Sequence, residues 1–351
     1  MEQKVVKKRK YYIDIIKIVC IYNVCFGHSG PTGFLAYETA TGLTQAIMLA
    51  YSTFIRVGIP LFFMCTGALL LTREEPIKDL WVKRILKYMF ITVFFTLVYY
   101  IVLSVRNNTP IDIPFILKTV YSTWGYSHSG SYWFLYSYIA FLILLPFLRL
   151  IARGLNKHLV WYMIIVNTVV CGVLPLLEAS LGMEDWGVDI SLITLDVFFY
   201  PFMGYYIEKA PVEEICNKKN LIVCFVMTVI SILSCVKYTI ETMLYKGYST
   251  QEFMGVFQLY VAFLIYIGAK MLNEKIKIEG RLAKVITEIA MCTFGIYLIH
   301  GIVYIGVDDF LMAKGVPFTY LVAKMRGAIV FVISLVIVWI CRRIPFIKKL
   351  F

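Results

Sequence analysis

The stretch YMFITVFFTLVYYIVLSV, Tyr88–Val105, decides the fold class of this 351-residue chain. It runs for 18 residues without Asp, Glu, Lys or Arg. About 20 apolar residues in an α-helix span the hydrocarbon core of a bilayer, where only helices and closed barrels satisfy every backbone polar group. We therefore expect Tyr88–Val105 to form a transmembrane helix.

The same pattern recurs along the chain, which is 60% hydrophobic and only 16% charged, whereas soluble domains carry about 25% charged residues. Six further runs lack charge: Tyr132–Leu148, Leu159–Leu177, Asn220–Val236, Phe253–Ala269, Ile289–Val307 and Gly327–Cys341. Three apolar segments contain charge: Ile13–His28, Ala46–Leu71 and Ile190–Ile207. The sequence predicts an all-α, polytopic membrane protein, a bundle of about ten transmembrane helices. We expect one domain over residues 1–351, without an appended soluble domain.

The connections between these segments alternate in charge. The N-terminal MEQKVVKKRK is basic, every second connection after it is rich in Lys and Arg, and the others hold few. Because basic connections stay on the cytoplasmic side, we expect both the N- and the C-terminus to be cytoplasmic. No small-residue cleavage site follows MEQKVVKKRK, so we expect a retained first helix. The net charge of +12 is then mostly a topology signal that also attracts anionic lipid, and it requires no nucleic acid.

The cysteines predict no special chemistry. The nine residues form no CxxC pair and show no His/Cys spacing typical of metal ligands. All but Cys216 fall in apolar segments, where cysteine behaves as a small apolar residue. We expect neither a disulfide framework nor a metal site.

The first apolar segment carries three ionisable side chains, Asp14, Lys17 and His28. Lys17 and His28 are separated in a helix by about 16 Å of rise and only ~20° of rotation, and Asp14 falls within ~40° of the same stripe. The predicted topology places Asp14 and Lys17 toward the cytoplasm and His28 toward the outer side. Two interpretations remain open for the inner pair: a functional role, or snorkelling and local pairing. For His28 the alternative to a functional role is an ordinary interfacial residue.

Other segments place Arg56, Asp196 and His300 in the outer half of the predicted bilayer. Ionisable groups at that depth usually face a cavity or one another and mark a functional path. Structural alternatives stay open. Asp196 and Arg56 would form an ion pair that holds two helices together, and His300 would be a neutral histidine that is hydrogen-bonded to another helix. It is the coincidence of several such groups that favours a functional site.

The connection TREEPIKDLWVKRILKYMF places Lys83, Arg84 and Lys87 at the cytoplasmic start of a predicted helix. Arg84 and Lys87 are three positions apart and would share a helix face. Anchoring by positive charge on the cytoplasmic side explains each cation. The functional alternative is a clamp for the phosphates of a cofactor that approaches from the cytoplasm.

Together these stretches resemble the acyltransferase-3 family of integral-membrane O-acyltransferases, which includes O-acetylases of bacterial surface polysaccharides, lipopolysaccharide and peptidoglycan. The resemblance covers most of the chain and rests on four places: the basic residue and histidine at Lys17 and His28, RVGIPLFFMCTGALLL at Arg56–Leu71, the Arg-x-x-Lys of Arg84 and Lys87, and WFLYSYIAFLILLPFL at Trp133–Leu148 with FGIYLIH at Phe294–His300. The family more often has arginine where Lys17 and Lys87 stand, and serine in place of Thr66. Lysine keeps the charge but loses the planar fork that binds phosphate through two hydrogen bonds.

For the donor side, the resemblance implies an acyl-CoA co-substrate, most often acetyl-CoA, that enters from the cytoplasm. Lys83, Arg84 and Lys87 would supply the cations that bind its phosphates. Lys17 would contact the CoA moiety or pair with Asp14.

For the acceptor side, the resemblance implies O-acetylation of a cell-envelope glycan or a related hydroxyl-bearing acceptor at the outer face of a bacterial cytoplasmic membrane. His28 would deprotonate the hydroxyl or carry the acyl group transiently. Arg56 or His300 would stabilise the tetrahedral oxyanion. Tyr126 and His128, in the longest outer connection, are further candidates for contact with the acceptor.

Two other classes of protein fit a polar outer cavity in a helix bundle. A transporter or flippase would often show internal repeats, and the sequence shows no clear repeat. A membrane sensing or uptake module, like family relatives fused to other catalytic domains, is the second alternative. Acyl transfer by the purified protein would separate both from an enzyme.

Overall fold

The computed structural model describes residues 9–30, 33–124, 132–182, 196–247, 251–317 and 319–351. Within these ranges the regular structure is entirely helical, with no strand. The all-α prediction is confirmed. The helices are α1 (Tyr11–Gly27), α2 (Gly42–Arg56), α3 (Gly58–Leu70), α4 (Ile77–Leu80), α5 (Leu86–Arg106), α6 (Ile113–Ser122), α7 (Trp133–Arg153), α8 (Lys157–Thr168), α9 (Leu174–Leu181), α11 (Asp196–Lys209), α12 (Val212–Ile215), α13 (Lys218–Lys246), α14 (Gln258–Lys275), α15 (Gly280–Ala313) and α16 (Tyr320–Cys341).

In the described part of the chain, eight helical stretches are long and apolar enough to cross a membrane: Gly42–Leu70, Ile77–Arg106, Trp133–Arg153, Lys157–Leu181, Lys218–Lys246, Phe253–Lys275, Gly280–Ala313 and Lys324–Cys341. The first predicted segment forms α1, of 17 residues. The predicted segment Ile190–Ile207 begins outside the described residues, and its described part lies in α11. The chain is a multi-pass membrane protein.

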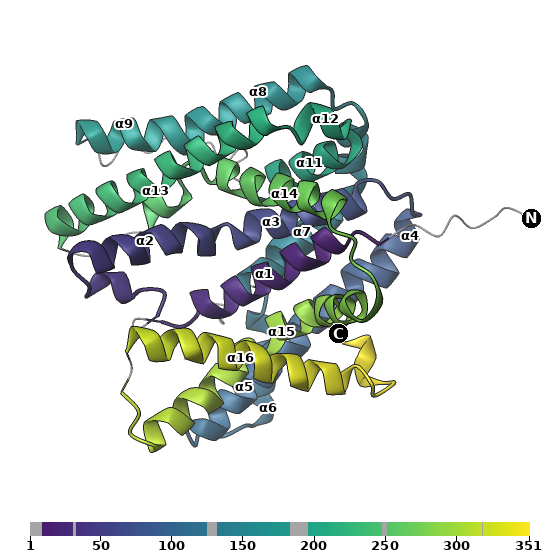
Figure 1. Cartoon of the computed structure of the whole chain (residues 1–351). Helices are drawn as coiled ribbons and strands as arrows, with labels where there is room; N and C mark the ends of the chain where they lie inside the picture. The colour runs from purple at the N-terminus through teal and green to yellow at the C-terminus, as the bar shows by residue number, and fades with distance from the viewer. Residues whose placement is uncertain (1–8, 31–32, 125–131, 183–195, 248–250, 318) are drawn as a thin grey trace, which may run out of the picture.

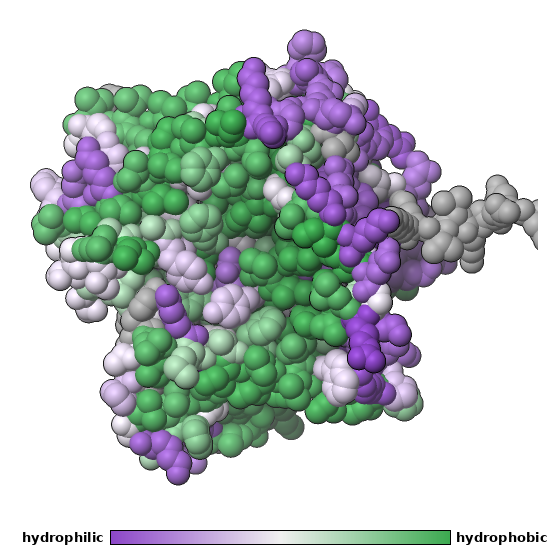
Figure 2. Space-filling model, viewed as in Figure 1, coloured by the Kyte–Doolittle hydropathy of each residue, from purple (hydrophilic) through white to green (hydrophobic). Residues whose placement is uncertain are grey.

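The surface agrees with a protein that lies in lipid. Figure 2 shows apolar side chains over most of the visible face, with hydrophilic side chains gathered densely at the end where α1 begins and α4 lies. Helix α1 begins, and α16 ends, toward this same end of the bundle (Figure 1). The two chain ends therefore lie on one side, as the predicted topology requires, and their cytoplasmic location stays a prediction.

Helix α1 lies inside the bundle rather than at its edge. It packs against α2, α3 and α14 on one side and against α15 and α16 on the other (Figure 1). This position explains how Asp14, Lys17 and His28 are accommodated in an apolar segment, because neighbouring helices and cavities, rather than lipid, surround most of the helix.

Two glycines allow α3 and α11 to cross in backbone contact. A Cβ atom on Gly67 would lie 2.0 Å from the carbonyl oxygen of Pro201, and one on Gly204 would lie 2.0 Å from that of Met64. Small residues permit such close approach between membrane helices, where packing drives association. Helix α3 also packs against α1.

A break between α2 and α3 places Arg56 at the end of a helix. Helix α2 ends at Arg56, Val57 lies between the helices, and α3 begins at Gly58. Pro60 has no N–H to donate to the carbonyl of Arg56, and its ring crowds that carbonyl. The Arg-x-x-Ile-Pro sequence thus ends one helix and starts the next, with the arginine at the junction.

Candidate active site

An outer cavity of about 310 Å³ lies at the C-terminal end of α1. Its walls include His28, Arg56, Trp133, Gln251 and Gln258. Two of the three predicted catalytic residues, from α1 and α2, therefore line one space. Their approach is secured by α1 itself, where the side-chain amide of Asn23 donates to the carbonyl oxygen of Phe54 at 3.0 Å.

His28 caps the C-terminus of α1 and is exposed toward this cavity. The ring of His300, from α15, lies beside it, with 5.1 Å between the two ring centroids and 47° between their planes. His300, the third predicted catalytic residue, thus lies next to His28 but does not line the outer cavity. The stripe predicted on α1 ends at a pair of histidines.

His300 is fully buried, and its environment sets its tautomer. Its Nδ1 lies 2.6 Å from the carbonyl oxygen of Tyr297. Because a carbonyl only accepts hydrogen bonds, Nδ1 carries the proton in the neutral ring and Nε2 keeps its lone pair. Nε2 is buried and has no hydrogen-bond partner among the described residues. His300 is therefore equipped to accept a proton or a hydrogen bond rather than to stabilise an oxyanion.

Two side chains that were not predicted from the sequence form hydrogen bonds to backbone carbonyls at the end of α1. The hydroxyl of Tyr304, on α15, donates to the carbonyl oxygen of Cys25 at 2.6 Å, and Nη2 of Arg326, on α16, donates to that of Ser29 at 2.7 Å. Arg326 is only 6% exposed, and its Nε lies 3.1 Å from a carboxylate oxygen of Asp308. The last carbonyls of a helix lack intrahelical partners, so these donors fix the turn that carries His28.

The described side-chain neighbours of Arg56 are Gln251 and Phe34. Its guanidinium donates to the side-chain oxygen of Gln251 and lies 5.8 Å from the ring centroid of Phe34. The side chain of Asp196, the predicted ion-pair partner, lies outside the described residues, as do Tyr126 and His128. The positive charge of Arg56 faces the outer cavity beside His28, where it can interact with a developing negative charge.

At the opposite end of α1, an inner cavity of about 280 Å³ is lined by Lys17, Arg73 and Arg84. Asp14 does not neutralise Lys17, because its carboxylate pairs with Arg9 at 2.6 Å. Among the described residues, no acid forms an ion pair with Lys17 or Arg73. Local pairing of Asp14 with Lys17 was one open interpretation; in the structure Asp14 pairs with Arg9 and Lys17 lines the inner cavity. Arg73 was not predicted as a site residue, although it lies in the same basic connection as Arg84.

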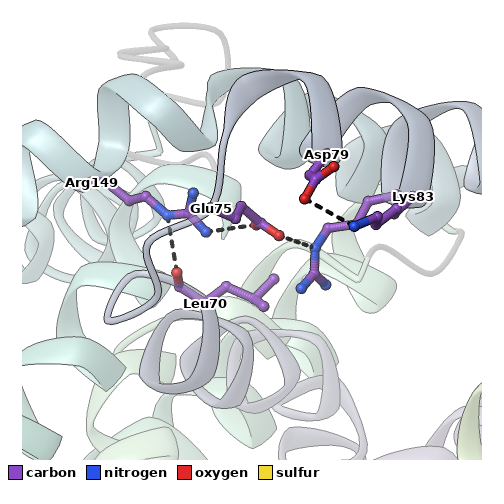
Figure 3. Close-up of polar contacts among 6 residues, drawn as sticks. Leu70, Glu75, Asp79, Lys83 and Arg149 are labelled. Atoms are coloured by element: carbon purple, nitrogen blue, oxygen red, sulfur yellow. Dashed lines mark hydrogen bonds and ion pairs between the residues drawn. The ribbon is translucent and has the colours of Figure 1, made fainter. Parts of the chain in front are cut away.

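The predicted trio Lys83, Arg84 and Lys87 is not brought together. Arg84 lines the inner cavity, and its Nε lies 3.0 Å from Glu75, whereas Lys83 pairs with Asp79 at 2.9 Å. Figure 3 shows Asp79 and Lys83 turned toward each other, apart from the pair formed by Glu75 and Arg149. Lys87 is exposed and does not line the cavity.

Lys83 and Arg84 lie in a π-helical turn, Trp81–Ile85. The expected common face of Arg84 and Lys87 assumed 3.6 residues per turn, but a π turn closes i→i+5 hydrogen bonds and shifts the positions that follow. Arg84 lies inside this turn and Lys87 just after it. Of these two cations only Arg84 lines the inner cavity, so a common face toward this cavity is not observed.

A narrow cavity of about 20 Å³ lies between the inner and outer cavities. It shares Phe62 and Phe294 with the inner cavity and Val24 and Tyr297 with the outer one. Phe134 lines all three. Three neighbouring cavities thus follow one another along α1 between the inner cations and His28. Among the described residues, no cluster of three His, Cys, Asp or Glu is suited to a metal ion.

Residues 10–343 match the family model of the acyltransferase-3 family, described as an acyltransferase domain. No curated protein matches the chain. No solved structure matches it either.

Proposed function

Because the chain belongs to the acyltransferase-3 family and is a multi-pass membrane acyltransferase, we propose that it is an O-acetyltransferase. It moves an acetyl group from cytoplasmic acetyl-CoA to a hydroxyl group of a cell-envelope glycan at the outer face of a bacterial cytoplasmic membrane. Membrane lipid surrounds the bundle, and the reaction uses acetyl-CoA as a co-substrate.

The observation that carries this proposal is the series of three cavities along α1. A CoA thioester has a phosphorylated end and a slender arm that ends in the acyl group. The inner cavity offers Lys17, Arg73 and Arg84 to the phosphates, and the narrow cavity is lined by Phe62 and Phe134. The acyl end of a donor bound in this way points toward His28 and Arg56. Lys17 and His28 lie about 16 Å apart by helix rise, so one extended ligand is needed to join the two ends.

His28 acts as the general base in this scheme. It takes the proton of the acceptor hydroxyl, whose oxygen then attacks the thioester carbonyl carbon. The resulting tetrahedral oxyanion is stabilised by Arg56, which lines the same cavity. The carbon–sulfur bond breaks, the ester forms, and the CoA thiolate recovers the proton from His28. A transient acyl group on His28 would use the same geometry in two steps.

His300 assists His28 rather than replacing it. Its unpartnered Nε2 lies in the ring adjacent to His28. As a hydrogen-bond acceptor it orients the imidazole of His28 and stabilises the positive charge that forms there when His28 is protonated. The carbonyl of Tyr297 holds His300 in the tautomer that this role requires.

The purified protein tests the proposal directly. Incubation with acetyl-CoA and a panel of envelope glycans should release the CoA thiol only when a suitable acceptor is present, and mass spectrometry should find an O-acetyl group on that acceptor. The rival function, a transporter or flippase, predicts glycan movement without thiol release. Absence of thiol release with every acceptor, together with glycan transport, would replace the enzyme by the carrier.

A further inference from the structure

A second basic hollow adjoins the inner cavity on the side of α4 and α7. This groove has a volume of about 520 Å³, and its charged walls are Arg73, Arg149, Arg153, Glu74 and Glu75. Arg73 lines both the groove and the inner cavity, so the two spaces are neighbours. A ligand that occupies the inner cavity can therefore extend into the groove.

The arginines around the groove outnumber the acids. Glu75 is shared by two of them, because its oxygens lie 2.8 Å from Nη2 of Arg149 and 3.0 Å from Nε of Arg84 (Figure 3). Arg149 also donates to the carbonyl oxygen of Leu70 at 3.2 Å, which fixes its side chain at the wall. One carboxylate between two guanidinium groups leaves an excess of positive charge at this wall.

The remaining two arginines are the ones available to a ligand. Arg153 pairs with Glu74 at 2.9 Å, but the two side chains are 58% and 83% exposed, and such surface pairs are worth little. Arg73 has no ion pair with a described acid. An anion that enters the groove would meet Arg73 unneutralised and would compete with Glu74 for Arg153.

The groove also has an apolar wall, formed by Ile77, Pro146 and Leu150. A flat aromatic base can pack on such a surface, and arginine guanidinium groups stack on aromatic rings and bind phosphate oxygens in pairs. Cations beside an apolar wall fit a phosphorylated nucleoside better than a bare phosphate ion, which would leave the apolar wall unused.

We propose that this groove binds the 3′-phosphorylated adenosine end of the acyl donor, with Arg73 and Arg153 contacting the 3′-phosphate. The assignment rests on the proposed function, since it takes acetyl-CoA as the donor. If the groove binds the 3′-phosphate, the protein should prefer a donor that carries this phosphate over one that lacks it. A phospholipid headgroup carries related chemistry, and the test below separates the two sources.

The experiment compares acetyl-CoA with 3′-dephospho-acetyl-CoA in vesicles of zwitterionic lipid. Loss of charge-assisted hydrogen bonds should raise the KM of the wild-type protein for the dephosphorylated donor by about 10-fold or more. In the double variant Arg73→Ala, Arg153→Ala, the KM for acetyl-CoA should rise toward that value, while the KM for the dephosphorylated donor changes much less. Lys78→Ala is the matched control, because this exposed cytoplasmic-end cation is absent from the groove lining, and it should keep the wild-type ratio.

Other results would overturn the groove assignment or the proposed function. Equal KM values for the two donors in the wild-type protein, with normal turnover, would overturn the groove assignment and leave the proposed function intact. A KM ratio that disappears only when anionic lipid is added would instead identify a lipid headgroup as the occupant and overturn it too. No turnover of either donor would overturn the proposed function. The groove can then still be tested by binding alone: the affinity for adenosine 3′,5′-bisphosphate should exceed that for 5′-AMP by a similar factor, and equal affinities would overturn the groove assignment.

Discussion

The two ends of α1 hold their functional side chains by different means. At the outer end, His300 and Ser29 are fully buried, Arg326 nearly so, and the contacts run to backbone carbonyls. At the inner end, Lys83, Arg84 and Arg153 are partly or largely exposed and pair with carboxylates. Lys17 and Arg73 line the inner cavity without an ion pair to a described acid. The outer end therefore has one geometry, while the inner end has several charges that can replace one another.

This difference suits two different tasks. Proton transfer and attack on a thioester require atoms to be placed within a fraction of an ångström, which buried hydrogen bonds achieve. Binding phosphates requires mainly an excess of positive charge, which several mobile cations supply. Single substitutions should then be severe at the outer end and graded at the inner end.

The largest effect is expected at His28. Both His28→Ala and His28→Gln remove the base, and general-base catalysis is typically worth about 10²–10⁴-fold, so acetyl transfer should fall by that factor. Donor binding should persist, because the inner cations are untouched. The measurement is the initial rate of acceptor acetylation by purified protein, with thermal unfolding as the control for folding. Wild-type rates in both variants would remove His28 from the mechanism.

The next largest effect is expected at Arg326, a positioning residue that does not line the outer cavity. Arg326→Ala releases the carbonyl of Ser29, so kcat should fall about 10–100-fold while the donor KM stays near its wild-type value. Arg326→Lys keeps a donor and a charge and should restore part of kcat. A purely structural role would instead lower the melting temperature without separating kcat from KM, and unchanged kcat in both variants would contradict positioning.

Graded effects are expected at the inner end. Lys17→Ala and Arg84→Ala each remove a cation from the inner cavity, and the KM for acetyl-CoA should rise about 10-fold, with kcat less affected. Lys87→Ala is the comparison, because Lys87 lies outside that cavity, and its KM should rise less than about threefold. A larger effect at Lys87 than at Lys17 would show that the donor follows another route.

The smallest effect concerns stability, through Glu75. Burial alone would raise the pKa of Glu75, but hydrogen bonds from Arg149 and Arg84 outweigh burial and lower this pKa below its ordinary value of 4.5. A lowered pKa contributes stability above pH 4.5 that is lost as the pH falls through the folded-state pKa. Glu75→Gln should therefore melt about 2–4 °C below wild type at pH 7, and the gap should close at acid pH. A gap that stays constant with pH would exclude the charge of Glu75 as its cause.

The sequence predicted the helical class and the membrane segments. In lipid, a long apolar run such as Tyr88–Val105 hydrogen-bonds all of its backbone polar groups by forming a helix. It also predicted that Lys17 and His28 lie on one stripe, since rise and rotation along α1 are local properties. Those two residues now line the inner and outer cavities. Local geometry was sufficient wherever a single regular helix carried the argument.

The rest depended on contacts between segments far apart in the chain. Arg326 contacts Ser29 across 297 positions, and the only sequence signal was a cation at the start of the apolar run Gly327–Cys341. The π turn at Trp81–Ile85 was not predicted from the sequence, and of Lys83, Arg84 and Lys87 only Arg84 lines the inner cavity. Asp14 pairs with Arg9 just before α1, rather than with Lys17 one turn later.

In the proposed function, an acetyl group travels along α1 from a donor on one side of the membrane to an acceptor on the other. The direct measurement uses sealed vesicles that contain the protein, with acetyl-CoA carrying a labelled acetyl group on the side of the basic loops and the glycan acceptor only on the opposite side. Labelled ester should form on the acceptor with wild-type protein and not with His28→Gln, while CoA stays on the donor side. Acetylation that occurs only when donor and acceptor share one compartment would contradict it.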